Sequence, residues 1–449
     1  METDFEYKYQ NASFFSDKNN DKLFSFSHCT EIEEDLKVPC FFYGNIINAY
    51  TASRCLSVLA STVSSHFALT PGQLIYLKDP IVSVGNNELH FEAFSSCNSV
   101  YARVDVLSEG IDGEFLHAGC TNIDFNNQTI RAFNAISKTE KLLIGVGSKQ
   151  VQFVTEKNKT SEKKVSLPNR WIKGLGNVQV YLSEMELAFR LTKFEALQLF
   201  KTLPKTAIKE DYFLSKNGFV YAFSPIRKND SIKIGGIHRL NLFKSLILSI
   251  DSLLIYKNEN EQSFALVLDF KDIQMTFLFS NSVYRGFSGE GKHLENLVDT
   301  ISNELIIRMN NFFKTNETFN PTLISIESDI ELNKMQTLQS TLSSIGLLGY
   351  NLSNNNYFYR RLPFKLERLI GFNPRLKNAK SIIEKDEITI IEKKEDYIKA
   401  KAKGTADIFH TVIYNNGSYQ CTCNWYTNNQ NNRGMCKHIL ALTMIIEMK

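Results

Sequence analysis

Residues 421–438 read CTCNWYTNNQNNRGMCKH and gather three of the eight cysteines of this 449-residue chain, together with one histidine. Cysteine and histidine supply the soft sulfur and nitrogen ligands that hold zinc in proteins. The other five cysteines are scattered over the first 120 residues. In a reducing compartment, metal ligation explains clustered cysteines better than disulfide bonding does. The stretch therefore predicts a small metal-held unit near the C-terminal end.

The residues before this cluster predict a β-hairpin. Gly404 to Tyr419 alternates in side-chain character and contains the pair Asn416 and Gly417. An Asn-Gly pair between alternating segments is a strong hairpin signal, and residues two apart on a strand point to one side. We therefore expect Cys421 and Cys423, on the returning strand, to converge on one ion.

The residues after the cluster predict a helix. Ile439 to Met448 has apolar residues at helical spacing. Two residues that are two apart within a helix diverge, so we place Cys436 in the turn before the helix and His438 in its first turn. Both side chains can then face the cysteine pair.

Four residues are thus predicted to hold one structural zinc ion: Cys421, Cys423, Cys436 and His438. Closed tetrahedral zinc has ligand distances of about 2.3 Å to sulfur and about 2.0 Å to nitrogen. A unit of about 45 residues has little core of its own, and a structural zinc contributes on the order of 10 kcal/mol to folding. The alternative is that these residues are clustered by chance and that the cysteines serve as small buried hydrophobic residues.

The rest of the chain predicts an α+β fold, a mixed body of helices and antiparallel sheets at residues 1–380 that could divide into two subdomains. The zinc finger, a hairpin plus a helix, then occupies 381–449. The sequence shows no internal repeat. Residue patterns predict a helix at 49–66, several strands within 75–125, a helix that starts at a capping box of Ser183 and Glu186, and a strand at Thr322–Glu327.

Composition points to a globular protein in the cytoplasm. Hydrophobic residues make up 43% of the chain and charged residues 22%. No basic and apolar leader opens the sequence, and the most apolar stretch is too short and too often interrupted for a membrane span. Because the formal net charge is only +3, an anionic partner would need a local patch such as Arg360 to Lys380, which is otherwise a solvated face.

The C-terminal pattern, Cys-x-Cys followed by Cys-x-His before a terminal helix, resembles the SWIM zinc finger. The segments CTCNW and CKHILAL stand where that family has its ligands. Upstream, FEAFSSCNSVYARVD, TNIDF, LPNRWIKGL and RGFSGEG resemble the body of bacterial SWIM zinc-finger proteins, so the likeness extends over nearly the whole chain. The resemblance implies a zinc-stabilised module that contacts proteins or DNA. It also suggests AAA+ ATPases or von Willebrand A domain proteins as partners.

Three functions follow as hypotheses. The first is a non-catalytic module for protein–protein interaction in a larger assembly. The second is DNA binding, in which the finger orients a basic patch that contacts phosphates through Arg360, Arg361, Lys365, Arg368, Arg375 and Lys377. The third is a nucleotide hydrolase that uses Gly286 to Lys292, although a glycine-rich turn explains GFSGEGKH at 286–293 as well. No catalytic residues are assigned.

Two weaker patterns have a structural alternative. His117 and Cys120, with Cys97 or His90, could form a second metal site but lack a convincing fourth ligand, which favours ordinary packing. In the spacer of the finger, Trp425, Tyr426 and Arg433 could contact a partner or a base, or they could cover the zinc.

Overall fold

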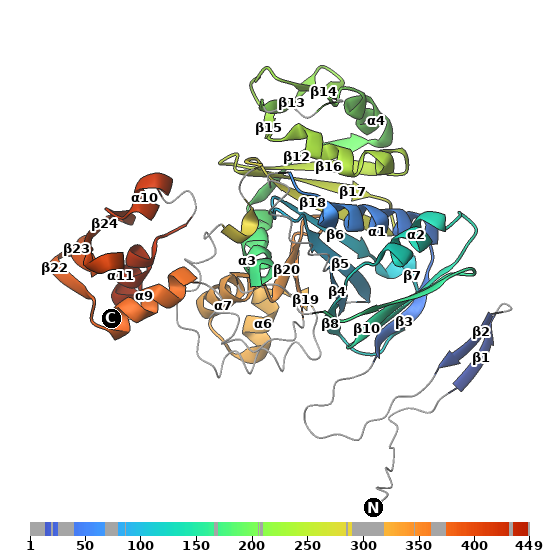
Figure 1. The fold of residues 1–449 in the computed structure, drawn as a ribbon, viewed down its shortest axis with the longest axis horizontal. Coiled ribbons are helices and arrows are strands. Elements are labelled where there is room, and N and C mark those ends of the chain that lie inside the picture. Colours follow the sequence, from blue (N-terminus) through green and yellow to red (C-terminus); the bar gives the residue numbers. More distant parts are fainter. Residues whose placement is uncertain are drawn as a thin grey trace, which may run out of the picture.

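The computed structural model describes residues 14–18, 21–25, 40–67, 80–85, 87–165, 169–204, 206, 210–283, 286–289, 318–344, 346–360, 374–430 and 434–447. Antiparallel sheets and helices form a large body, and a small unit of helices and strands stands at the C-terminal end (Figure 1). The predicted α+β class is confirmed. Among the described residues, no helix combines the length and apolar character needed to cross a membrane.

The first part of the body consists of two halves that exchange their leading strands. In each half a strand precedes a helix, and three paired strands follow. The leading strand of each half adds to the sheet of the other half, because β3 pairs with β9 and β8 pairs with β4. The halves are therefore interlocked, a structural repeat that the sequence does not reveal. Their elements are β3 (Cys40–Ile46), α1 (Ala49–Ser64), β4 (Ile81–Gly85), β5 (Glu88–Phe94), β6 (Val100–Val106) and, after β7 (Ile111–Phe115), β8 (Gly119–Asn122), α2 (Asn127–Ala135), β9 (Leu142–Gly147), β10 (Gln150–Val154) and β11 (Lys159–Lys163).

Helix α1 confirms the helix predicted at 49–66 and ends two residues earlier. The side chain of Asn48 caps it by accepting a hydrogen bond of 3.2 Å from the backbone N–H of Thr51. The apolar residues at helical spacing are buried against β5 and β6. On its other side, Arg54 donates to Asn134 of α2 at 3.3 Å. Helices of the two halves are thus neighbours.

The second part of the body extends the first sheet. β18 pairs with β6, which produces an eight-stranded antiparallel sheet in the order β12-β16-β17-β18-β6-β5-β4-β8. A separate three-stranded sheet and helix α4 lie beyond the β12 end of it (Figure 1). The elements added here are α3 (Asn169–Ser183), β12 (Met185–Thr192), α4 (Lys193–Lys201), β13 (Tyr212–Asn217), β14 (Val220–Ser224), β15 (Ile232–Ile234), β16 (Ser252–Asn258), β17 (Ser263–Asp269) and β18 (Ile273–Ser280).

The prediction that a helix starts at Ser183 is wrong. Ser183 ends α3, and the next residues form the edge strand β12, which pairs with β16. The capping box lies nine residues later, where Thr192 and Glu195 bond each other's backbone at the start of α4. Leu191 on β12 is fully buried, so pairing and burial against the sheet outweigh the local helical pattern.

The strand predicted at Thr322–Glu327 is also wrong, because these residues lie in helix α6 (Pro321–Ser328). The side chain of Asn320 accepts hydrogen bonds from the first two free N–H groups of the helix, and proline occupies its first position. Both are helix-start signals that a strand-like apolar run concealed.

A third part of the body packs against helix α3. It contains α6, α7 (Leu332–Ser344) and a sheet of β19 (Thr318–Phe319), β20 (Leu348–Asn351) and β21 (Asn356–Tyr359). A Cβ atom placed on Gly176 of α3 would lie 1.9 Å from the carbonyl oxygen of Ser344, so only glycine permits this close approach to α7.

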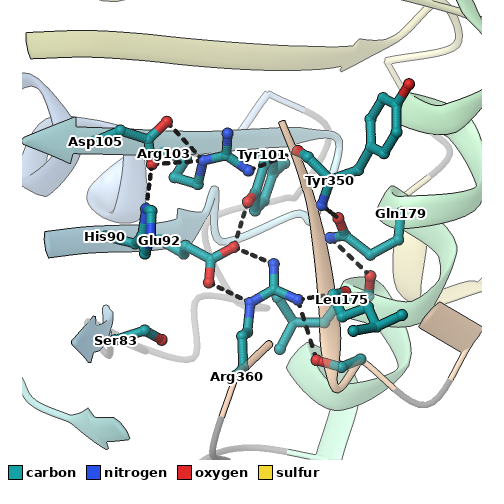
Figure 2. A network of polar contacts seen from close by, with 12 residues as sticks. Ser83, His90, Glu92, Tyr101, Arg103, Asp105, Leu175, Gln179, Tyr350 and Arg360 are labelled. Atoms are coloured by element: carbon teal, nitrogen blue, oxygen red, sulfur yellow. Dashed lines mark hydrogen bonds and ion pairs between the residues drawn. The ribbon is translucent and has the colours of Figure 1, made fainter. Parts of the chain in front are cut away.

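A buried ion pair fastens this third part to the eight-stranded sheet. Arg360 is fully buried and donates from Nε to Glu92 of β5 at 2.6 Å. Its Nη1 also donates to the carbonyl oxygens of Gly346 (3.1 Å) and Leu348 (2.7 Å). The hydroxyl of Tyr101 donates to the same Glu92 carboxylate. Figure 2 shows this carboxylate between its two donors.

A second ion pair lies beside the first. Arg103 of β6 donates from Nε to Asp105 and from Nη1 to the carbonyl oxygen of Tyr350, at 2.8 Å in the latter case (Figure 2). His90 is hydrogen-bonded to Asp105 at 2.7 Å and stacks on Phe358 of β21. Buried charges and a shared aromatic ring therefore connect β5 and β6 to the small sheet.

The C-terminal unit has three layers. A four-stranded antiparallel sheet, in the order β22-β23-β24-β25, packs on α11, and α11 packs on α9 (Figure 1). Helix α9 spans the boundary expected between residues 380 and 381 and contributes its apolar face to a core with α11. The elements are α9 (Pro374–Glu384), β22 (Ile388–Lys394), β23 (Tyr397–Lys403), β24 (Phe409–Asn415), β25 (Ser418–Cys421), α10 (Asn424–Asn429) and α11 (Lys437–Glu447).

Candidate metal centre

The hairpin predicted before the cysteines is present as β24 and β25. The turn between these strands contains Asn416 and Gly417, both with positive φ (45° and 79°), as a two-residue hairpin turn requires. Cys421 pairs with Val412, which is fully buried in the core of the unit. Cys423 follows two residues later and is buried on the same side.

Helix α11 positions the other two side chains as the sequence predicts. Cys436 comes directly before the helix, and His438 is its second residue. The backbone N–H of Ile439 donates to the sulfur of Cys436 at 3.4 Å, which directs a free N–H of the first turn toward the cluster. A bound thiolate would benefit from this donor because it stabilises negative charge on sulfur.

The four side chains converge at one buried point. The ligand atoms of Cys421, Cys423, Cys436 and His438 all lie within 4.8 Å of one another. Nδ1 of His438 is 3.7 Å from the sulfur of Cys421 and 4.0 Å from that of Cys436. A zinc tetrahedron with ordinary bond lengths has edges of roughly 3.5–3.8 Å, so a small contraction would close these ligands on one ion. The residues present therefore fit one structural metal ion.

Burial makes an accidental cluster of thiols costly. The three cysteines and the histidine are between 1% and 5% exposed. Contacts among the sulfurs raise the pKa of Cys421, chiefly through hydrogen bonding to Cys423, and the same contacts lower the pKa of Cys423. Three neighbouring thiolates repel one another, and a divalent cation allows all of them to ionise together.

The aromatic residues of the spacer cover the centre. Trp425 and Tyr426, from α10, are half-buried and pack in the cluster of apolar residues that contains the three cysteines. Trp425 donates from Nε1 to the carbonyl oxygen of Gly434 at 3.1 Å, and the guanidinium of Arg375 lies 4.4 Å from its ring centre. This supports the covering role for these two side chains, whereas Arg433 lies outside the described residues.

The imidazole of His438 presents one nitrogen to the sulfurs and buries the other. Nε2 has no hydrogen-bond partner in the described part of the chain. The ring of His410, from β24, lies beside it with ring centres 4.7 Å apart. Nδ1 is therefore the nitrogen placed to bind an ion shared with the sulfurs.

The residues of the weaker second metal pattern do not form another cluster. Among the described residues, only the C-terminal set of Cys and His side chains is close enough to share an ion. His90 belongs to the ion-pair network of the body, and Cys120 is buried beside Ser83 at 3.5 Å. Ordinary packing accounts for His90 and Cys120.

The glycine-rich stretch is described only at 286–289, so the rest of the proposed nucleotide loop lies outside the described residues. Phe287 is buried, and its backbone N–H donates to the carbonyl oxygen of Asn98 at 2.8 Å. A Cβ on Gly286 would lie 2.5 Å from the carbonyl oxygen of Cys97. This part packs as a tight turn against the body.

Two arginines of the basic patch predicted at Arg360 to Lys380 make structural contacts instead of facing a ligand. Arg360 is fully buried in its ion pair with Glu92, and Arg375 stacks on Trp425. Lys377 and Lys380 are exposed on α9. The remaining positions, Arg361, Lys365 and Arg368, lie outside the described residues.

No family model matches this chain, and no curated protein matches it. Among solved structures, the crystal structure of proliferating cellular nuclear antigen from Entamoeba histolytica matches 54% of this chain and 98% of its own length, at 11% identity and a TM-score of 0.35. A likeness at that score assigns neither a fold nor a function. The assignment of the metal centre therefore rests on the positions of its four side chains alone.

Proposed function

We propose that the C-terminal unit is a zinc-stabilised recognition module through which this chain binds a protein partner in a larger assembly. The observation that supports this most directly is the closed ligand set. Three cysteines and one histidine would complete the tetrahedron of a bound zinc ion and leave no position for a substrate or a water molecule. A zinc ion held in this way stabilises a fold, and the function then belongs to the surface that the fold presents.

The surface of the unit offers apolar groups to a partner. Ile391, Ile408 and Phe409 are 53%, 58% and 59% exposed. Large apolar and aromatic side chains at a surface are typical of protein contacts, although single ones are common on any protein. The resemblance to SWIM fingers agrees with a protein partner, including an AAA+ ATPase or a von Willebrand A domain protein.

The test compares two cysteine variants of the full chain. Wild type and Cys40→Ser, which changes a cysteine of the body, should each bind about one zinc ion per chain. Cys421→Ser should lose the ion. It should also fail to retain any protein partner that both wild type and Cys40→Ser retain. If Cys421→Ser retains the same proteins, the zinc-held unit is not the recognition module.

A second candidate function is nucleic-acid binding. The patch predicted from the sequence has lost Arg360 and Arg375 to structural roles. A different feature favours this function, a row of lysines on the central strand β23 of the C-terminal sheet.

A further inference from the structure

The C-terminal sheet has one covered face and one open face. On β23 the residues Ile398, Ala400 and Ala402 are buried, and they belong to the core that includes the metal ligands. Helix α11 packs on that face, on the side of the unit nearer the body (Figure 1). The alternate residues of β23 are exposed or half-buried and point to the other face, which is the open face.

The open face carries lysines in a regular row. Lys399, Lys401 and Lys403 alternate with the buried residues of β23, so successive members are about 6.7 Å apart along the strand. This spacing is comparable to that of successive phosphates in an extended nucleic-acid strand. The row is flanked at one end by Tyr397, and Phe409 is the partner of Lys403 on β24. Cations and aromatic rings therefore lie side by side on one surface.

Acidic groups neutralise only part of this row. Lys403 pairs with Asp407 at 2.8 Å and Glu387 at 3.3 Å. Glu392 lies opposite Lys399 but makes its ion pair with Lys394, at 2.7 Å. Lys401 lies opposite Thr389 and Thr411 and has no ion pair among the described residues. The centre of the open face is thus a site of unbalanced positive charge.

Most uncharged residues of the open face are suited to hydrogen bonding. They are Thr411 and Asn415 of β24, Ser418 and Gln420 of β25, and Thr422 directly after it, whereas Ile413, opposite Lys399, is apolar. Peptides usually bind at sheet edges or in grooves, where backbone pairing or pockets hold them. Single-stranded nucleic acids instead lie across sheet faces, where bases stack on aromatic rings and lysines contact the phosphates. The flat arrangement favours the second kind of ligand.

We propose that this open face binds single-stranded nucleic acid, with Lys399 and Lys401 at its centre and Phe409 at one end of the lysine row. The proposal deepens the second candidate function and moves its contact surface from α9 to β23 and β24. Zinc takes no part in the contact. It holds β25 and α11 together and so keeps the sheet in the shape that presents this face.

The test measures binding of a fluorescent oligothymidylate to the zinc-loaded full chain, by anisotropy, over a range of salt concentrations. The variant Lys399→Ala/Lys401→Ala should bind more weakly, and its slope of log affinity against log salt should be smaller by about 1.4, since each phosphate contact on a single strand contributes about 0.7. The matched control Lys377→Ala/Lys380→Ala removes two exposed lysines from α9 and should bind like wild type.

A second pair of variants tests the aromatic contact. Phe409→Ala should lower affinity on the order of tenfold, because it removes a stacking platform. Phe219→Ala, which changes an almost fully exposed phenylalanine of the body, should have no effect. Zinc content and thermal stability of all four variants should equal those of wild type, so that a loss of binding reflects the surface alone.

Several results would overturn the proposal. One is failure of wild type to bind the oligonucleotide even near 50 mM salt. Another is a loss of affinity in the α9 variant as large as that in the β23 variant. A third is competition by duplex DNA or polyglutamate that equals competition by single strands. None of these results would affect the zinc-dependent retention of a protein partner. That assay tests the recognition module separately.

Discussion

The metal centre and the buried ion network of the body solve the same problem in different ways. Each joins chain segments through polar groups that have been removed from water. In the metal centre, one ion can bind Cys421 at the end of β25, Cys423 directly before α10, and two residues at the start of α11. In the body, Glu92 and Arg360 neutralise each other, although 268 residues separate them along the chain. The first arrangement depends on an ion from solution, and the second depends only on the fold.

This difference means that the two regions should fail under different conditions. A structural metal contributes a large share of the stability of a small unit and is removed by chelators. A buried ion pair gives little net stability, but it is costly to break on one side only. The chain has two tryptophans, Trp171 buried in the body and Trp425 beside the metal centre, so fluorescence can follow each region separately.

The largest expected effect comes from removing a metal ligand. Cys421→Ser should abolish zinc binding and unfold the C-terminal unit, because structural zinc contributes on the order of 10 kcal/mol in small units. Metal analysis, together with Trp425 fluorescence in a Trp171→Phe background, measures both losses. Cys120→Ser, a buried cysteine of the body, serves as control and should keep the ion. Full zinc retention by Cys421→Ser would remove this site as the metal centre.

A smaller but still large effect should follow from breaking the ion pair of the body. Arg360→Met leaves the Glu92 carboxylate buried without its main partner, which should lower the free energy of unfolding by about 3–5 kcal/mol. Denaturant unfolding followed by Trp171 in a Trp425→Phe background measures this. Adding Glu92→Gln should recover part of the loss, since no buried charge then remains.

An exposed ion pair provides the control for this prediction. Arg227 and Glu261 are 2.6 Å apart at the surface, where water screens the interaction. Arg227→Ala should therefore change stability by less than about 1 kcal/mol. Equal effects of Arg360→Met and Arg227→Ala would show that the buried pair has no special role in joining the parts of the body.

The same contrast explains what could be predicted from sequence. The metal ligands are visible because they lie within eighteen residues and because a hairpin signal and a helical pattern flank them. The ion network cannot be predicted from the sequence. There, Glu92 is one polar residue in a predicted strand, and Arg360 belongs to a predicted basic surface patch. Only the paired sheets reveal that both are buried. The misplaced helix start near Ser183 has a similar cause, since pairing of β12 with a distant strand decides its conformation.

Acidification should destabilise the body in a defined direction. Burial raises the pKa of the Glu92 carboxyl, but the charge and hydrogen bonds of Arg360 outweigh it and hold the pKa below its ordinary value; Asp105 beside Arg103 and His90 behaves likewise. The unfolded chain therefore binds more protons than the folded chain in acid. The stability that these groups contribute is present above the ordinary carboxyl pKa of about 4 and is lost as the pH falls below it.

Unfolding curves of the body at a series of pH values, followed by Trp171, measure this loss. Glu92→Gln/Arg360→Met should show a weaker dependence on pH below about 4 than wild type does. The C-terminal unit should release its zinc at a higher pH than that, because protons compete with the metal for three thiolates. A body that loses its structure before the zinc is released would contradict this order.

The smallest expected effect concerns the link between helix α9 and the metal centre. Arg375 donates from Nη1 to the carbonyl oxygen of Met435 at 3.2 Å and lies over the ring of Trp425. Arg375→Ala should weaken the unit by about 1 kcal/mol, which is typical of a partly exposed cation–π contact, and should raise the rate of zinc loss to a chelator. Lys377→Ala, an exposed neighbour on the same helix, should leave that rate unchanged. If both variants released zinc at the wild-type rate, α9 would be packed against the unit without stabilising its metal centre, and the ligands with α10 and α11 would be sufficient to hold the ion.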